Sequence, residues 1–172
     1  MVSAPEGLRE LPRLAAEQVR ARVAGVPDPE LPVVTLAELG VIRSVGLAPD
    51  GRLEVVVTPT YLGCPAMPAI EAGIRAVLVA CGHPDGRVRQ VLAPPWSTER
   101  ITPEGRRKLA EHGIAPPGAV DAPVAVRLGL GARCPHCGSE ATRPQSAFGA
   151  TRCQAVVFCT ACRETFAHLK AM

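Results

Sequence analysis

The apolar residues of this chain follow two spacings, one typical of helices and the other of strands. In the first 25 residues they recur every three or four positions, which predicts a helix that ends at Gly25. The same spacing predicts a second helix from about Met67 to Ala80. Thr102 and Pro103 form an N-cap and first-turn pair, so they predict a last helix, which ends at Gly113.

Three short runs that contain β-branched residues predict strands. The runs at 41–47 and 53–58 flank the turn sequence Ala-Pro-Asp-Gly, so we expect them to pair as an antiparallel hairpin. The third run, at 88–92, follows the second helix, and a strand–helix–strand crossover places its last strand parallel to its first. The expected fold class is therefore α+β, with a small mixed three-stranded sheet and packed helices.

The composition divides the chain into a domain, a linker and a smaller module. Apolar residues make up 47% of the chain but aromatic residues only 3%, so the core must be mainly aliphatic. Residues 1–115 carry the elements above and are expected to form one domain. Residues 116–131 are rich in Gly, Ala and Pro and read as a linker, in which Val124–Leu130 is a candidate strand. Residues 132–172 form the C-terminal module.

The chain carries no signal for export or membrane insertion. Its first residues have neither a basic segment nor an apolar one, and the longest nearly apolar run, Ala76–Cys81, is too short to cross a bilayer. We therefore expect a cytoplasmic protein without a membrane partner. In that compartment the seven cysteines are expected to be reduced, metal-bound or reactive.

The strongest chemical signal is a pair of Cys-x-x-Cys motifs in the C-terminal module. Two intervening residues let a tight turn present both thiolates to one ion, and two such turns complete a tetrahedral site. Zn²⁺ in a structural role is the expected metal, with a rubredoxin-type iron as the alternative. About 40 residues with few large apolar groups need such a metal to fold, which predicts a zinc ribbon. The expected ligands are Cys134, Cys137, Cys159 and Cys162.

This module is basic, but not basic enough to predict nucleic-acid binding. It carries five basic and two acidic side chains. Four thiolates on a dication contribute a charge of about −2, so the net charge falls to about +1, a weak electrostatic attraction for phosphates. No aromatic residues are interleaved with the arginines. His136, inside the first motif, is expected to point to solvent rather than to bind the metal.

Cys64 is the second candidate for chemistry. It stands between a predicted strand and the start of the second helix, where the helix dipole and first-turn N–H groups lower the pKa of a thiol. Such a thiol suits transient metal or sulfur chemistry, although a free cysteine is as often a small packing residue. Nothing places a general base, His83 or His112, beside it, so we expect no catalytic residue. Cys81 and Cys153 are expected to be buried packing residues.

Four short motifs occur in order along the N-terminal domain. They are Asp28-Pro29-Glu30, Leu39-Gly40-Val41-Ile42, Thr58-Pro59-Thr60-Tyr61-Leu62-Gly63-Cys64-Pro65 and Pro95-Trp96. These motifs resemble the SufT-like family of iron–sulfur assembly domains. The segments 96–117 and 148–153 resemble one branch more closely, the D subunits of bacterial phenylacetyl-CoA oxygenase (epoxidase) systems. Gln154 departs from that branch, in which we expect Lys, and it is not a metal ligand.

The resemblance implies an accessory role in phenylacetate catabolism, in maturing the iron–sulfur or other metal centre of a multicomponent oxygenase, without independent turnover. It assigns function to Cys64 and Asp28, which would bind a transient Fe ion or Fe–S cluster, and Cys153 also fits the pattern. The implied partners are the oxygenase and reductase subunits and iron–sulfur assembly proteins, and we also consider a homodimer. The alternative is a scaffold subunit that only holds the oxygenase components together.

The loop at 26–32 contains three prolines, which exclude a helix and keep the loop stiff. If this loop folds beside the strand end at 58–61, the carboxylate of Asp28 approaches the thiol of Cys64. A carboxylate raises the pKa of a neighbouring thiol unless a cation lies between them. Both residues are expected at exposed loop positions, so replacing either should cost at most about 1–2 kcal/mol of stability.

Overall fold

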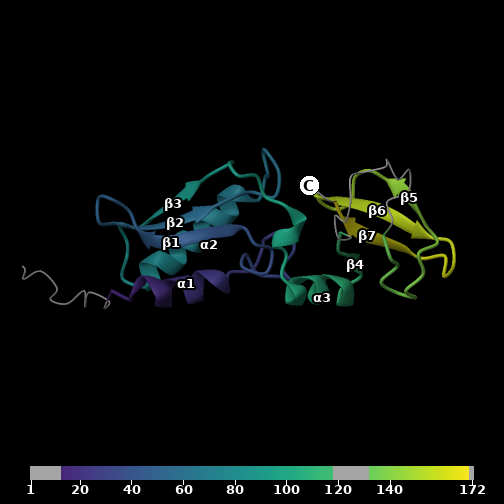
Figure 1. The fold of residues 1–172 in the computed structure, drawn as a ribbon, viewed down its shortest axis with the longest axis horizontal. Coiled ribbons are helices and arrows are strands. Elements are labelled where there is room, and N and C mark those ends of the chain that lie inside the picture. The colour runs from purple at the N-terminus through teal and green to yellow at the C-terminus, as the bar shows by residue number, and fades with distance from the viewer. Residues whose placement is uncertain (1–12, 118–131, 171–172) are drawn as a thin grey trace, which may run out of the picture.

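The computed structural model describes residues 13–117 and 132–170, and its two parts lie side by side (Figure 1). The sheet of the N-terminal part contains β1 (Ile42–Leu47), β2 (Leu53–Val57) and β3 (Arg87–Gln90), in that spatial order. β1 pairs with β2 antiparallel, and β3 pairs with β2 parallel. The predicted α+β class, hairpin and parallel third strand are confirmed. The candidate strand at 124–130 lies outside the described residues.

The described helices of the N-terminal part are α1 (Ala16–Ala24), α2 (Met67–Ala80) and α3 (Pro103–Glu111), with a 3₁₀ helix at Thr98–Arg100. α2 has the predicted bounds, and its Ile70, Ile74 and Leu78 are buried. α1 packs against both β1 and α2. The Thr102 hydroxyl accepts a hydrogen bond of 3.0 Å from the N–H of Gly105, which confirms Thr102 as the N-cap of α3.

The C-terminal part is a four-stranded sheet in the order β4-β7-β6-β5. Its strands are β4 (Ile114–Ala115), β5 (Thr142–Ser146), β6 (Gln154–Cys159) and β7 (Thr165–Leu169). β5, β6 and β7 form the antiparallel ribbon, and β4 pairs parallel with β7. β4 was not predicted, because two residues are too few to show a period. It follows α3 directly, so the segment that ends the helix also contributes a strand to the ribbon sheet.

The two parts share buried apolar contacts. The main core lies between the first sheet and the helices, around side chains such as Val55 and Ile74, which are fully buried. The same cluster includes Cys153 and Leu169 of the ribbon. A smaller core within the ribbon surrounds Val157 and Phe166. The ribbon is therefore packed against the N-terminal part as well as folded on its own core.

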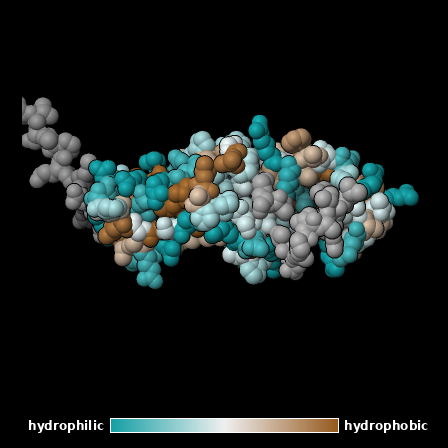
Figure 2. All heavy atoms as spheres, turned by 45° about the horizontal axis from the view of Figure 1, so that its top comes forward, coloured by the Kyte–Doolittle hydropathy of each residue, from teal (hydrophilic) through white to brown (hydrophobic). Residues whose placement is uncertain are grey.

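Among residues 13–117 and 132–170, none of the helices has the length and apolar character that crossing a membrane requires. The exposed large apolar side chains are Leu47, Leu62, Val79, Leu92 and Phe148. On the face shown in Figure 2, apolar side chains reach the surface of both parts, between larger polar areas.

Candidate metal and thiol sites

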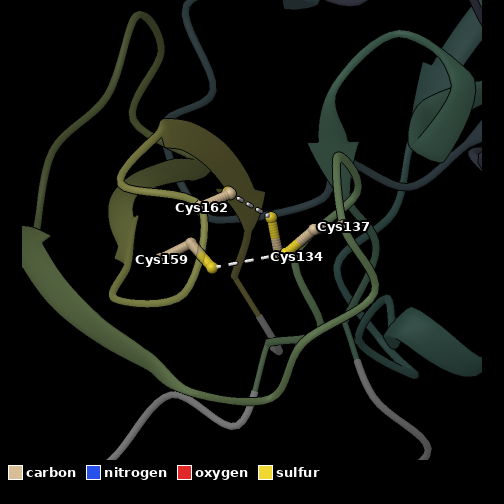
Figure 3. Close-up of side chains that lie close together, drawn as sticks. All are labelled: Cys134, Cys137, Cys159 and Cys162. Carbon is tan, nitrogen blue, oxygen red and sulfur yellow. Dashed lines mark hydrogen bonds between the residues drawn. The ribbon is translucent and has the colours of Figure 1, made fainter.

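The structure brings the four cysteines of the Cys-x-x-Cys motifs together (Figure 3). Their sulfur atoms all lie within 4.8 Å of one another. The Sγ atoms of Cys134 and Cys162 are 3.7 Å apart, and those of Cys137 and Cys159 are 3.6 Å apart. Four sulfurs around a tetrahedral Zn²⁺ at 2.3 Å would be about 3.8 Å apart, so the thiols already have the spacing that such an ion needs.

Both motifs use the same backbone turn to reach this spacing. The N–H of Gly138 donates to the carbonyl of Cys134 at 2.9 Å, and the N–H of Arg163 donates to the carbonyl of Cys159 at 2.9 Å. Gly138 and Arg163 both have positive φ angles, of 73° and 64°. The first turn uses Gly at this left-handed position, whereas the second accepts the strain of a side chain there.

The turn directs backbone N–H groups toward the sulfur atoms. Hydrogen bonds from the N–H groups of Cys162 and Ala161 lower the pKa of the Cys159 thiol to about 7. Cys134 and Cys159 are buried and Cys137 is exposed, so one side of the cluster meets solvent. His136 is exposed, as expected, and its ring forms a T-shaped contact with Phe166, with ring centroids 6.5 Å apart.

The second site contains Asp28, which was expected to be an exposed loop residue but is buried. Its side chain is only 6% exposed. The Oδ1 atom accepts hydrogen bonds from the N–H of Glu30 at 2.9 Å and of Leu31 at 2.8 Å. The N–H of Asp28 in turn donates to the carbonyl of Val34, so the prolines and these bonds fold the loop over its own carboxylate. Burial raises the pKa of Asp28, against the lowering effect of the two N–H groups.

Cys64 was also expected at an exposed loop position. It is partly buried against the main core rather than exposed, and it lies two residues before Ala66, the N-cap of α2. The N–H of Ala66 lowers the pKa of this thiol, but burial has the larger effect and raises it. The carboxylates of Glu30 and Asp28 raise it further. The predicted lowering of the Cys64 pKa by the helix is therefore wrong, and the Asp28 carboxylate raises that pKa, the direction expected for a carboxylate near the thiol.

Cys153 comes from the ribbon, immediately before β6, yet it reaches the same region. It is 5% exposed and belongs to the main core, which confirms it as a buried residue. Burial raises the pKa of the Cys153 thiol, and Glu30 and Asp28 add to this effect. The Thr151 hydroxyl lies 2.9 Å from its Sγ atom. The two carboxylates that influence Cys64 therefore also influence Cys153.

Tyr61 lies near enough to these groups for their charges to affect its hydroxyl. Burial, together with the charges of Cys64, Glu30 and Cys153, raises the pKa of Tyr61 to about 12. Its hydroxyl oxygen is buried and has no hydrogen-bond partner that meets normal geometry among the described residues. We call this group of side chains the interface thiol site: Asp28, Glu30, Tyr61, Cys64 and Cys153.

A pocket of about 230 Å³ adjoins the interface thiol site. Glu30 and Pro65 line it from the N-terminal part, and residues 148–152 line it from the ribbon. Pro65 follows Cys64 in the chain and Arg152 precedes Cys153, so the chain neighbours of both cysteines line this pocket. Glu30 and Tyr61 belong to the sequence motifs of the N-terminal domain, but no role was predicted for either from the sequence.

The two histidines weighed as bases hydrogen-bond to backbone carbonyls elsewhere. His83 Nε2 is 2.8 Å from the carbonyl oxygen of Leu14, and His112 Nδ1 is 2.8 Å from that of Lys108. Cys81 is fully buried at the far end of α2 from Cys64, as expected for a packing residue. The described residues therefore do not place a histidine base at Cys64.

Fold and site together define a class of protein: an iron–sulfur assembly domain joined to a zinc ribbon. The family model described as iron-sulfur cluster assembly protein matches residues 16–92, and the model described as PaaD zinc beta ribbon domain matches residues 122–170. A relative from Escherichia coli (strain K12), described as the D subunit of a 1,2-phenylacetyl-CoA epoxidase, is 36% identical over 96% of this chain and 100% of its own. This chain belongs to the family of phenylacetyl-CoA epoxidase D subunits.

Two further relatives match about half of this chain. The Fe-S protein maturation auxiliary factor YitW of Bacillus subtilis (strain 168) is 30% identical over 50% of this chain and 84% of its own. The Fe-S protein maturation auxiliary factor SufT of Staphylococcus aureus (strain USA300) is 32% identical over 45% of this chain and 88% of its own.

Proposed function

We propose that this chain is an accessory protein that matures the iron–sulfur or other metal centre of a multicomponent phenylacetyl-CoA oxygenase, with Cys64 as a transient metal or sulfur ligand. The observation that carries the proposal is the half-buried Cys64 thiol beside the carboxylates of Asp28 and Glu30. Full-length similarity to an epoxidase D subunit supports the oxygenase as client. Similarity to two Fe-S protein maturation factors supports the role of Cys64 as a transient metal or sulfur ligand.

The four ribbon cysteines have a separate role in this proposal. They bind one Zn²⁺ that folds the ribbon, because four thiolates fill a tetrahedral ion and leave no position for a substrate. Their sulfur–sulfur distances of 3.6 Å and 3.7 Å support this assignment. The metal that the chain delivers to the oxygenase is a different ion, which is held transiently at Cys64.

The chain performs no turnover of its own in this proposal. It acts in the cytoplasm on the oxygenase and reductase subunits, together with iron–sulfur assembly proteins. Self-association stays a prediction of the sequence.

The test of the accessory role is to incubate the purified chain with a reductant and an aryl-CoA substrate and to search for hydroxylated or epoxidised product. Product formation by the chain alone would contradict the accessory role.

Complementation tests the role of Cys64. In a strain that lacks the protein, Cys64→Ser should fail to restore oxygenase activity, while the variant accumulates normally and melts near the wild-type temperature. Cys81→Ala is the matched control, because it removes a thiol at the other end of α2 and should restore activity. Full rescue by Cys64→Ser would contradict a ligand role and leave the scaffold role in its place.

A further inference from the structure

The ribbon contributes a cysteine to the region that contains Cys64. Cys153 precedes β6, whose last residue is Cys159, so one strand joins the four-cysteine cluster to the interface thiol site. The backbone holds Cys153 firmly, because its carbonyl accepts a bond of 2.9 Å from the N–H of Lys170. The N–H of Gln154 donates to the carbonyl of Thr151 at 3.1 Å. Folding of the ribbon therefore sets the position of the Cys153 thiol.

Both thiols lie in a region of negative charge. Asp28 and Glu30 act on Cys64 and on Cys153, and neither carboxylate forms an ion pair within 4.0 Å in the part of the chain that the structure describes. Both hydrogen bonds to Asp28 go to Oδ1. Buried carboxylates are stable when a cation balances them or when they hold a proton. The surroundings of the two thiols thus favour a bound cation.

We propose that Cys153 is the second thiol of the Cys64 site, so that one thiol from each part of the molecule binds a single Fe²⁺, in the negative field of Asp28 and Glu30. This inference rests on the proposed function and adds to it a role for the ribbon. Thiolate ligands favour borderline and soft cations such as Fe²⁺ over hard ones such as Mg²⁺. The pocket lined by Glu30 and by the chain neighbours of both cysteines is the route by which the ion would enter and leave.

The site differs from the ribbon cluster in a way that suits delivery. Within the described residues, only the four ribbon cysteines form a group of three or more ligand side chains whose ligand atoms all lie within 4.8 Å. The interface thiol site is therefore wider and does not enclose an ion. Two protein thiols leave coordination positions open, and a ligand from the client can occupy them before the ion is released. A closed four-thiolate site offers no such position.

The proposal gives the ribbon a function beyond packing. Its zinc cluster folds β6, β6 positions Cys153, and Cys153 completes the pair with Cys64. A two-thiol site retains Fe²⁺ longer than a one-thiol site, because both bonds must break before the ion leaves.

The test uses the full-length chain with its ribbon filled with zinc, titrated anaerobically with Fe²⁺. X-ray absorption at the iron edge counts the sulfur atoms bound to iron, and zinc does not contribute at that edge. We expect two sulfur ligands per iron in the wild type and one in Cys153→Ala or in Cys64→Ser. Each variant should bind Fe²⁺ about 10–100-fold more weakly, at least the loss that removal of a supporting group near a metal causes. Cys81→Ala is the control and should retain both sulfurs.

Two outcomes would overturn the proposal: one sulfur or none per iron in the wild type, or an unchanged sulfur count in Cys153→Ala. The number of sulfur ligands per iron in the wild type tests the proposed two-thiol site even where a variant folds poorly. Zinc content and thermal unfolding show whether each variant keeps its ribbon, and Cys153→Val, which keeps the site apolar, replaces Cys153→Ala if it does not. An unchanged count with failed complementation by Cys64→Ser would refute only this inference. Complementation by Cys64→Ser would refute the proposed function.

Discussion

At the scale of single residues, Asp28 combines a structural and an electrostatic role. Its Oδ1 atom satisfies the N–H groups of Glu30 and Leu31 within a proline-rich loop, and its charge reaches the thiol of Cys64. A loop with three prolines has few other ways to satisfy its backbone donors. Two substitutions at Asp28 are therefore needed to distinguish these roles: one that removes only the charge and one that also removes the hydrogen bonds.

The hydrogen bonds of Asp28 can be tested through stability. Asp28→Ala leaves the two N–H groups without their acceptor, so we expect a loss of about 1–3 kcal/mol in the free energy of unfolding. Asp28→Asn keeps an oxygen acceptor and removes the charge, so it should melt near the wild-type temperature. Chemical denaturation followed by the fluorescence of Trp96 measures both variants. Equal stability of Asp28→Ala and wild type would show that the two bonds contribute nothing.

The charge of Glu30 can be tested through the reactivity of Cys64. Because burial and the nearby carboxylates raise the pKa of this thiol, the thiol is mostly protonated at neutral pH and reacts slowly with iodoacetamide. Glu30→Gln removes one of the charges, which lowers the pKa and should speed alkylation at neutral pH. Mass spectrometry of the peptide that contains Cys64 measures the rate, with Glu71→Gln on α2 as the control. An unchanged or slower rate in Glu30→Gln would contradict this arrangement.

At the scale of elements, the two cysteine turns hold the ribbon together. Its three antiparallel strands enclose a small core around Val157 and Phe166, which is too little apolar surface to fold 40 or so residues alone. The sulfur cluster joins the turn before β5 to the turn between β6 and β7. The stability of the ribbon should therefore depend on the bound metal.

Loss of one ribbon thiol should unfold the ribbon. We expect Cys159→Ser to lose its zinc and to disorder the strands β5, β6 and β7, while the N-terminal sheet remains folded with a lower melting temperature. Elemental analysis measures the metal, and NMR spectra show which amide signals lose their dispersion. Ser139→Ala, next to the first motif, is the control and should keep its zinc. A folded wild-type chain without any metal would contradict the role assigned to the cluster.

At the scale of the whole molecule, the ribbon and the N-terminal part are coupled. β4 follows α3 and pairs with β7, and Leu169 of β7 is 2% exposed within the main core. Cys153 joins the same core from the turn before β6. These contacts fix the interface thiol site, because four of its residues come from loops of the N-terminal part and the fifth, Cys153, comes from the ribbon.

The coupling predicts that one substitution in the ribbon affects both parts. Leu169→Ala removes a buried side chain from the shared core, so we expect a loss of about 2–5 kcal/mol in the free energy of unfolding. The temperature at which Trp96 fluorescence changes and the temperature at which zinc is released should both fall. Leu47→Ala, at an exposed residue of β1, is the control and should shift neither. A shift in zinc release alone would show that the two parts fold independently.

The amino-acid sequence by itself determined the features that depend on neighbours in the chain. The hairpin follows from two β-branched runs around a turn, and α2 follows from the spacing of Ile70, Ile74 and Leu78. The parallel position of β3 follows from the handedness of a single crossover. The Cys-x-x-Cys spacing predicts each turn of the sulfur cluster, because two intervening residues leave the backbone little freedom.

Only the tertiary structure decided the properties that depend on burial and on distant segments. Asp28 and Cys64 were expected to be exposed, but the fold buries Asp28 within its own hydrogen-bonded loop and partly buries Cys64 against the main core. The same burial reverses the expected direction of the Cys64 pKa, since removing a thiolate from water outweighs the N–H group of one helix start. No local pattern relates Cys153 to Cys64. The packing of Cys153 and Leu169 into the main core brings Cys153 to the cluster against which Cys64 packs, which no sequence spacing encodes.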